Sequence, residues 1–328
     1  MTELLVFAVM PKGTLSRADL PRDTGLPTAL RLIEGDAYSA VTGDAPPGGL
    51  AGLERSAILP WLLAGQTVMD HLRRHGCALP VSLGSLAEDE MRLAQALHRG
   101  APALDAAFDM LGTRQEMNLA VRWPVETVVS EVVAAFPAAL RDRAAAGTGD
   151  ALDAVATRLG EEITVRRKRI RQRVVERLEE LTEDIIETQP SDPAGVVDVA
   201  LLLEPSAETA LDAVLEELDG EFDGRLTFRL VGPLAPYNFA SVQLHLPARH
   251  EIAAARALLG VGEDDPEIKT AYRRAALGAH QDLALSRGDV EVVEAAGPDR
   301  MVAITAAYRT LLADAEPISI RRQEAVRD

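Results

Sequence analysis

Two of the six histidines stand four residues apart, the spacing at which two imidazole rings lie on one face of a helix and can share a metal ion. They are His71 and His75. No cysteine, aspartate or glutamate completes a pattern such as HExxH or CxxC with these or the other histidines. Because the sequence supplies no third ligand, we interpret the pair as surface or capping residues and expect no bound metal.

The other patterns that support catalysis are also incomplete. The stretch GDAPPGGLAG, which begins at Gly43, has prolines where a phosphate-binding loop needs free backbone amides, so we interpret it as an ordinary loop. Aspartate and glutamate together number 51, so no two carboxylates stand out as a general acid and a general base. The sequence therefore predicts a protein that is not an enzyme and has no cofactor.

Composition restricts the classes of partner. A formal net charge of −17 opposes attraction to nucleic acid and to anionic membranes, so we expect a protein partner. The longest apolar stretch, residues 57–65, contains Pro60 and is far shorter than the roughly 20 residues that cross a bilayer. The single cysteine, Cys77, precedes an apolar run and is expected to be a packed thiol in a reducing cytoplasm. No export signal is visible at the N-terminus.

The first third of the chain predicts an α+β domain. LLVFAVM is expected to be a buried strand, and two alternating segments on either side of Gly35 and Asp36 are expected to form a hairpin. Periodicity predicts helices over about residues 56–74, 87–98 and 101–111. The apolar positions that define the first of them are Leu59, Leu62, Leu63, Val68, Met69 and Leu72. The alternating stretch RQEMNLAVRW then ends at Pro124.

The clearest helix is expected over about residues 152–188. Its apolar stripe consists of Val155, Leu159, Ile163, Ile170, Val174, Leu178, Leu181 and Ile185. An exposed stripe of that length would promote aggregation, so we predict that it packs against another helix, in the same chain or in a second copy.

The polar faces of this helix carry a basic block from Arg166 to Arg173 and an acidic block from Glu176 to Glu187. One interpretation is a nucleic-acid-binding arm, which the acidic block and the net charge oppose. The other is a solvated or coiled-coil helix. Segregated charge of this kind also suits antiparallel self-association, in which each basic block meets an acidic one.

A compact unit follows the long helix. GVVDVALLLEP is expected to be a strand, Ser206 to cap a helix, RLTFRLV to be the next strand and SVQLHLP to return as a strand. The order strand, helix, strand, strand predicts the first part of a ferredoxin-like split βαβ arrangement. Between the last two strands lies GPLAPYNF, residues 232–239. Its prolines cannot donate to a sheet ladder, so we predict a corner that joins two neighbouring strands. We expect Tyr237 and Phe239 to close the core there; the alternative is an exposed aromatic platform for docking.

At this corner the sequence resembles the GvpL/GvpF family of gas vesicle proteins, whose signature is Gly-Pro-Trp-Pro-Pro-Tyr-Ser-Phe. The residues that match are Gly232, Pro233, Pro236, Tyr237 and Phe239. Leu234 stands in place of the tryptophan, Ala235 in place of a proline and Asn238 in place of the serine.

Two further motifs occur in the family's order. LPVSLGS resembles Leu-Pro-Leu-Arg-Phe-Gly-Thr through Leu79, Pro80 and Gly84. RQEMNLAV resembles the family's Glu-Trp strand through Glu116, with Met117 in the place of the tryptophan. Together the three motifs cover about residues 1–247.

The resemblance implies two α+β domains, of which the first is ferredoxin-like and the second contains a coiled-coil helix. It also implies a role in assembling gas vesicles, the hollow protein shells that give buoyancy. The implied partners are the small hydrophobic shell protein GvpA and other gas vesicle accessory proteins, in the cytoplasm and at the gas vesicle. No enzymatic activity is implied.

The segment from Ala254 resembles a J-domain of the DnaJ type. The matches are Leu258, Leu259, Gly260 and Val261 at its opening, and Ile268, Lys269, Ala271, Tyr272, Arg273, Arg274 and Ala275 in its second helix. ITAAYRTLLAD, from Ile304, resembles the third helix. Where such domains carry His-Pro-Asp, this chain has His280, Gln281 and Asp282. We predict an antiparallel helical pair with His280 and Asp282 in the connecting loop, and weak or absent stimulation of Hsp70 because the proline is lost.

These observations divide the chain into an N-terminal α+β domain (1–123), a helical segment with a second α+β domain (124–250) and a J-like extension (251–328). The leading hypothesis is an assembly factor that keeps apolar shell subunits soluble or recruits them to a growing shell. The alternatives are an adaptor that brings Hsp70 to such a client, and a small-molecule sensor. The candidate partner-binding residues are Leu234, Tyr237, Phe239, Lys269, Arg273, Arg274, His280 and Asp282.

Overall fold

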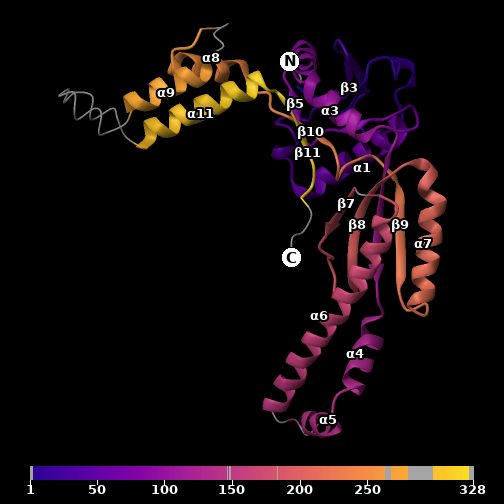
Figure 1. Cartoon of the computed structure of the whole chain (residues 1–328). Helices are drawn as coiled ribbons and strands as arrows, with labels where there is room; N and C mark the ends of the chain where they lie inside the picture. Colours follow the sequence, from indigo (N-terminus) through magenta and orange to yellow (C-terminus); the bar gives the residue numbers. More distant parts are fainter. Residues whose placement is uncertain are drawn as a thin grey trace. The chain divides into compact units, whose positions relative to one another are not determined.

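The computed structural model describes residues 3–145, 147, 149–182, 184–262, 267–279 and 298–324 (Figure 1). The protein is a mixed α/β protein with antiparallel sheets, and its contacts divide it into two compact units. The first unit contains Met1–Met110 and Ala240–Arg321, and the second contains Leu111–Phe239 with the end of the chain from Arg322. The boundary predicted after residue 123 differs from this division because strand β6 (Gln115–Arg122) pairs within the sheet of the second unit.

The sheet of the first unit is built around β1 (Leu4–Pro11), whose residues up to Met10 are all buried. β1 pairs antiparallel with β3 (Tyr38–Asp44), β4 (Leu79–Pro80) and β5 (Leu86–Ala87). β2 (Arg31–Glu34) pairs with β3, which confirms the predicted hairpin. The spatial order β2-β3-β1-β4 is that of the ferredoxin-like split βαβ fold, with a loop in place of the first crossover helix.

Three helices belong to the N-terminal part of this unit: α1 (Arg55–Leu72), α2 (Glu90–Arg99) and α3 (Ala101–Leu111). They confirm the three helices predicted from periodicity, with slightly shifted ends. The side chain of Asp89 caps α2 by accepting a hydrogen bond from the backbone N–H of Arg92 at 2.8 Å.

The sheet of the second unit has the order β7-β8-β6-β9 with antiparallel neighbours. Its other strands are β7 (Ile185–Thr188), β8 (Gly195–Leu203) and β9 (Thr227–Leu234). Helix α7 (Glu208–Glu221) connects β8 to β9, and β6 lies between these two strands. The strand, helix and strand predicted from GVVDVALLLEP to RLTFRLV are therefore confirmed as a split βαβ unit, but they form the second half of the ferredoxin-like order rather than its first part, and SVQLHLP does not join this sheet. The same strand order occurs in both units.

The prediction that the GPLAPYNF corner joins two neighbouring strands is wrong. Strand β10 (Ser241–Leu244), which follows the corner, pairs with β11 (Ile318–Arg321) in a two-stranded sheet of the first unit. β9 instead has β6 as its neighbour. The pairing of β10 is long-range in sequence, so alternation within a single segment does not reveal it.

The long helix α6 (Gly149–Glu179) is shorter than predicted, because Ile185 already belongs to β7. It packs beside α4 (Val125–Ala134) and α5 (Ala138–Ala145), as Figure 1 shows. Ile170, Val174 and Leu178 are buried in the core of the second unit. The predicted packing of the apolar stripe against another helix is thus confirmed within one chain.

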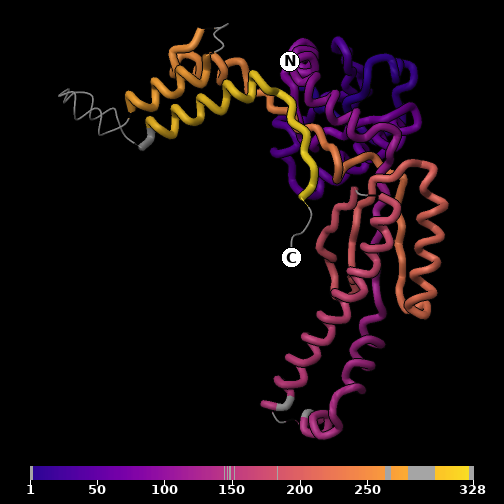
Figure 2. The backbone as a smooth tube through the Cα atoms, in the orientation of Figure 1, coloured from indigo at the N-terminus to yellow at the C-terminus, as the bar shows by residue number. Residues whose placement is uncertain are grey.

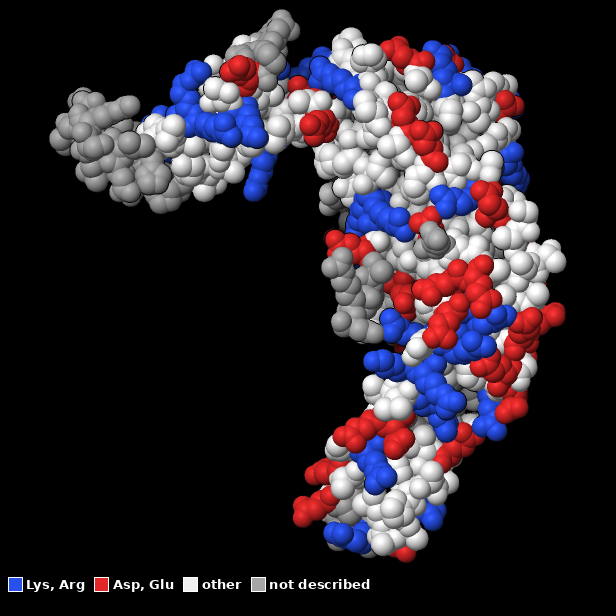
Figure 3. Space-filling view, viewed as in Figure 1, with Lys and Arg blue, Asp and Glu red and all other residues white. Residues whose placement is uncertain are grey.

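Four of the arginines of α6 have acidic partners in the second unit. The pairs are Arg166–Glu131, Arg171–Glu187, Arg173–Glu221 and Arg177–Glu217. In Figure 3, blue basic and red acidic side chains are accordingly mixed over the lower part of the view, where α6 lies. These residues therefore do not need a second copy to supply opposite charges, and self-association through this helix stays a prediction.

The C-terminal extension consists of α8 (Arg249–Leu259), α9 (Ile268–Ala279), α11 (Pro298–Ala315) and β11. α9 and α11 lie side by side and run in opposite directions (Figures 1 and 2), as predicted for a helical pair. Their core includes residues of all three helices: Ile252, Leu259, Ala271, Ile304 and Leu311. His280 and Asp282 lie outside the described residues, so their placement in a loop stays a prediction, as does the J-domain resemblance.

Asp314 of α11 links this extension to α2 within the first unit. Its carboxylate accepts a hydrogen bond from Arg92 at 3.0 Å, and its backbone carbonyl accepts one from Arg99 at 2.8 Å. Arg92 also donates to the carbonyl of Pro247 at 3.0 Å. Asp314 is 8% exposed, so this link is a nearly buried ion pair.

Candidate functional site

The GPLAPYNF motif begins inside a strand rather than after one. β9 continues through Gly232 and Pro233 to Leu234, and the peptide bond between Gly232 and Pro233 is cis. The turn follows at residues 237–239, where the N–H of Phe239 donates to the carbonyl of Pro236 at 3.2 Å. The reversal therefore lies beyond Leu234 instead of directly after RLTFRLV.

Gly232 is required by a close approach between β9 and β6. A β-carbon at this position would overlap Sδ of Met117 and would lie 3.1 Å from the carbonyl oxygen of Glu116. The register between the two strands shifts at the same place, between Glu116 and Asn118. This irregularity lets the motif pass close over β6, and glycine avoids the crowding that a side chain would cause there.

Glu116 connects β6 to the motif through buried hydrogen bonds. Its side chain is fully buried, and its carboxylate accepts hydrogen bonds from the backbone N–H of Asn238 at 2.9 Å and from its side-chain amide at 2.6 Å. Burial raises the pKa of Glu116, although the hydrogen bonds from Asn238 oppose that shift. Two motifs that are more than a hundred residues apart in the sequence therefore form one structure, which we call the Glu116 corner (Glu116 and residues 232–239).

The two aromatic side chains of the corner have different environments. Phe239 is 0% exposed, which confirms its predicted burial, and the guanidinium of Arg322 lies 5.5 Å from its ring centroid. Tyr237 is 41% exposed, so the expectation that it also closes the core is wrong. Leu234 is half-buried. The turn directs the phenylalanine inward and leaves the tyrosine at its outer side, so the corner presents one aromatic residue rather than a platform.

The remaining predicted residues that the structure describes lie in the first unit. Leu79 and Pro80 form β4 and are buried beside β1, while Gly84 has a φ of +89° in the turn that follows. In the extension, Lys269, Arg273 and Arg274 are exposed on α9, which contains no acidic residue. The predicted partner-binding residues thus belong to two different units.

The structure exposes a leucine face on α1 that the sequence does not predict. Leu59, Leu62 and Leu63 are 56%, 48% and 56% exposed, and we call them the α1 leucine face. The buried residues of the helix are Trp61, Ala64, Val68, Met69 and Leu72. Helical spacing places the two groups on different sides of the helix. The signal for this face is present in the sequence, because no charged residue occurs between Arg55 and Asp70.

His71 and His75 lie at the end of α1 and the turn after it, with ring centroids 5.0 Å apart. Nε2 of His71 is 2.6 Å from the carbonyl oxygen of Asp19. Within the described residues, no group of three His, Cys, Asp or Glu side chains is placed to hold a metal ion. None of the helices described is both long enough and apolar enough to cross a membrane.

Comparison with known proteins identifies the family. The family model described as gas vesicle synthesis protein GvpL/GvpF matches residues 3–241. The fold is similar to the crystal structure of gas vesicle protein GvpF from Anabaena sp. PCC7120, with a TM-score of 0.59 and 18% identity over 72% of this chain and 95% of that chain. It is also similar to GvpF from Microcystis aeruginosa, with a TM-score of 0.57 and 17% identity over 72% of this chain and 98% of that chain. No curated protein sequence matches the chain.

The family match includes all three sequence motifs and ends as β10 begins. Helices α8, α9 and α11 and strand β11 lie beyond it. At this level of identity the two solved structures show the fold alone, whereas the family model covers well over half of the chain. The chain therefore belongs to the gas vesicle synthesis protein GvpL/GvpF family.

Proposed function

We propose that this protein is a non-enzymatic accessory factor of gas vesicle assembly, which binds the hydrophobic shell protein GvpA in the cytoplasm and keeps it soluble or delivers it to the growing vesicle. Membership of the family connects the chain to gas vesicles. The observation that supports binding of a hydrophobic protein is the α1 leucine face.

Three large apolar side chains lie near each other on this face, because positions 62 and 63 follow position 59 by three and four residues, about one helical turn. Removing one leucine side chain from water contributes about 1.5 to 3 kcal/mol, so covering the face with an apolar partner is favourable. The helix is held by its other side, where Trp61, Val68 and Leu72 are buried. A rigid, uncharged and exposed surface of this kind suits an apolar partner.

The test is co-expression of the full chain with GvpA. We expect the natural protein to keep GvpA in the soluble fraction and to co-purify with it. The triple variant Leu59→Gln, Leu62→Gln and Leu63→Gln should lose most of the bound GvpA with an unchanged melting temperature, because these side chains are exposed in the folded protein.

Leu277→Gln is the matched control, because Leu277 is also exposed, at 61%, but lies on α9. It should retain GvpA. Natural protein that leaves GvpA insoluble and unbound contradicts the proposed function. A triple variant that binds GvpA as the natural protein does contradicts only the assignment to the α1 leucine face.

A further inference from the structure

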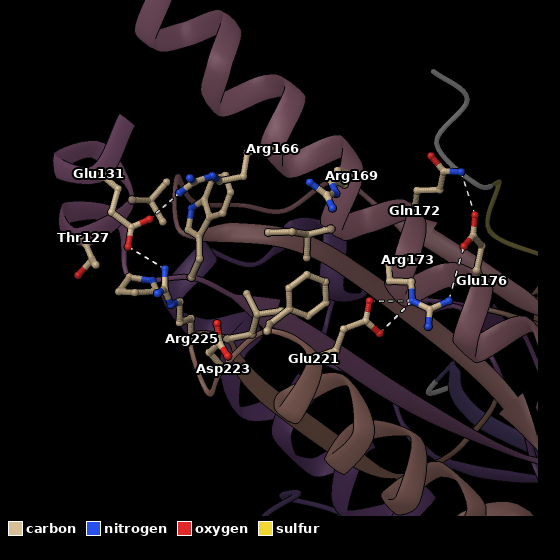
Figure 4. Close-up of a pocket in the computed structure, with 16 residues that line it drawn as sticks. Thr127, Glu131, Arg166, Arg169, Gln172, Arg173, Glu176, Glu221, Asp223 and Arg225 are labelled. Atoms are coloured by element: carbon tan, nitrogen blue, oxygen red, sulfur yellow. Dashed lines mark hydrogen bonds and ion pairs between the residues drawn. The ribbon is translucent and has the colours of Figure 1, made fainter. Parts of the chain in front are cut away.

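A hollow of about 610 Å³ lies in the second unit, between α4, α6 and the turn that follows α7 (Figure 4). Its volume is within the range of ligand-binding pockets. The apolar residues that line it belong to the core of the unit or pack against it: Trp123, Val128, Ile170, Phe222 and Leu226. The inner surface can therefore receive an apolar side chain.

Three arginines of α6 line this hollow at successive turns of the helix: Arg166, Arg169 and Arg173. The first is 2.9 Å from Glu131, and the third is 3.0 Å from Glu221. Arg169, between them, makes no hydrogen bond or ion pair with any described residue. Two of the three arginines thus have carboxylate partners, and Arg169 does not.

The opposite side of the hollow carries an acidic residue. Asp223 lies in the turn after α7, across from Arg169 in Figure 4, and its carboxylate has no partner among the described residues. A ligand with negative charge along its whole length, such as a nucleic acid, would be repelled there, and the net charge of −17 adds to that repulsion. The lining favours a ligand with an apolar group, one carboxylate on the α6 side and no negative charge on the α7 side.

We propose that this hollow is a docking site for a segment of another protein, in which a bulky apolar side chain stands next to an acidic residue. The apolar side chain enters the hollow, and the acidic side chain pairs with Arg169. Asp223 selects for a neutral or basic residue on the other side of the segment. This site is separate from the α1 leucine face and does not depend on the function proposed for that face.

The experiment selects short random peptides, displayed on phage, that bind the full chain. We expect enriched sequences in which an acidic residue neighbours leucine, isoleucine, methionine or phenylalanine. A synthetic copy of an enriched peptide should bind about tenfold more weakly to the Arg169→Glu variant, because an attractive charge pair becomes a repulsive one. Replacing the acidic residue of the peptide by lysine should restore binding to that variant.

Lys168→Glu is the control, because Lys168 is the exposed neighbour on α6 that does not line the hollow. It should bind the peptide as the natural protein does. In a Trp61→Phe background, Trp123 is the only tryptophan, and its emission should shift when the peptide enters.

The proposal is wrong if no sequence is enriched, or if the enriched peptides bind equally to the natural protein and to Arg169→Glu. It is also wrong if a fatty acid such as decanoate shifts the emission of Trp123 and the peptides do not, since the hollow would then be a small-molecule site.

Discussion

Glu116 is the residue that connects two motifs of the family in space. A fully buried carboxylate is costly unless it is hydrogen-bonded, and Asn238 supplies both a backbone and a side-chain donor. Gly232 permits the close approach that places these donors. The residues that match the family signature therefore mainly stabilise the structure of the corner. Tyr237 is the exposed aromatic residue among them.

The raised pKa of Glu116 predicts a specific dependence of stability on pH. A carboxyl group whose pKa is higher in the folded protein than the ordinary 4.5 binds its proton more tightly when folded. Its stabilising contribution is complete below 4.5 and is lost as the pH rises through the folded pKa. We therefore expect the melting temperature of the natural protein, relative to Glu116→Gln, to decrease as the pH rises from 4.5.

Thermal unfolding of both proteins between pH 4.5 and 8 measures this difference. Glu126→Gln, at an exposed position of α4, controls for the loss of one acidic side chain. A difference between the natural protein and Glu116→Gln that is constant with pH, or that increases with pH, would contradict the expectation.

Phe239 should contribute to stability rather than to binding. Replacing a buried phenylalanine by alanine costs about 3 to 5 kcal/mol, so Phe239→Ala should lower the melting temperature strongly, whereas Tyr237→Ala should change it little. Thermal unfolding and GvpA binding are measured on both variants. Unchanged stability with lost binding in Phe239→Ala would show that the corner is the docking surface instead.

At the scale of the elements, strands and helices that are distant in the sequence pair and pack with one another. β10 has its partner in β11, and α11 is held to α2 by Asp314. Gly100, after α2, leaves room for the side chain of Ile318, since a β-carbon there would lie 2.6 Å from Cβ of that residue. The extension is thus an integral part of the first unit.

Because Asp314 forms a nearly buried ion pair, we expect a measurable loss of stability when one partner is removed. Asp314→Asn leaves Arg92, whose side chain is 11% exposed, without its opposite charge and should destabilise the protein by about 3 kcal/mol. Arg249→Gln removes a pair with Asp89 whose arginine is 54% exposed, and should cost about 1 kcal/mol or less. Denaturant unfolding measures the loss of stability in both variants. Equal losses would contradict the conclusion that the pair of Asp314 and Arg92 is nearly buried.

At the scale of the whole molecule, the chain uses one strand order twice. Each unit has a sheet with the split βαβ order, and the helical extension adds to the first unit only. The family match ends at residue 241, so the extension is an addition to the part that defines the family.

Truncation after Pro247 tests whether the first unit needs this addition. The shortened chain retains every residue of the family match but loses β11 and Asp314. We expect its melting temperature to fall by several degrees, since each kcal/mol corresponds to about 2 to 4 °C in a chain of this size. An unchanged melting temperature would show that the extension is an independent appendage.

Elements with a local signal could be predicted from the amino-acid sequence. Alternation and helical spacing predicted the β2–β3 hairpin, the three helices of the first unit and the split βαβ of the second, and the motifs at Leu79, Glu116 and Gly232 identified the family. Periodicity succeeds here because each of these segments has one buried face, which fixes its pattern over a few residues.

Which segments contact one another is visible in the folded structure but not in the sequence pattern. It paired β10 with β11, placed Asn238 on Glu116 and left Leu59, Leu62 and Leu63 exposed, although the sequence alone assigned these leucines to the same stripe as Val68. It also gave carboxylate partners to Arg166 and Arg173 but none among the described residues to Arg169. A local pattern shows that a side chain is apolar or charged. What covers or pairs with it depends on residues tens to hundreds of positions away, which the folded chain alone brings together.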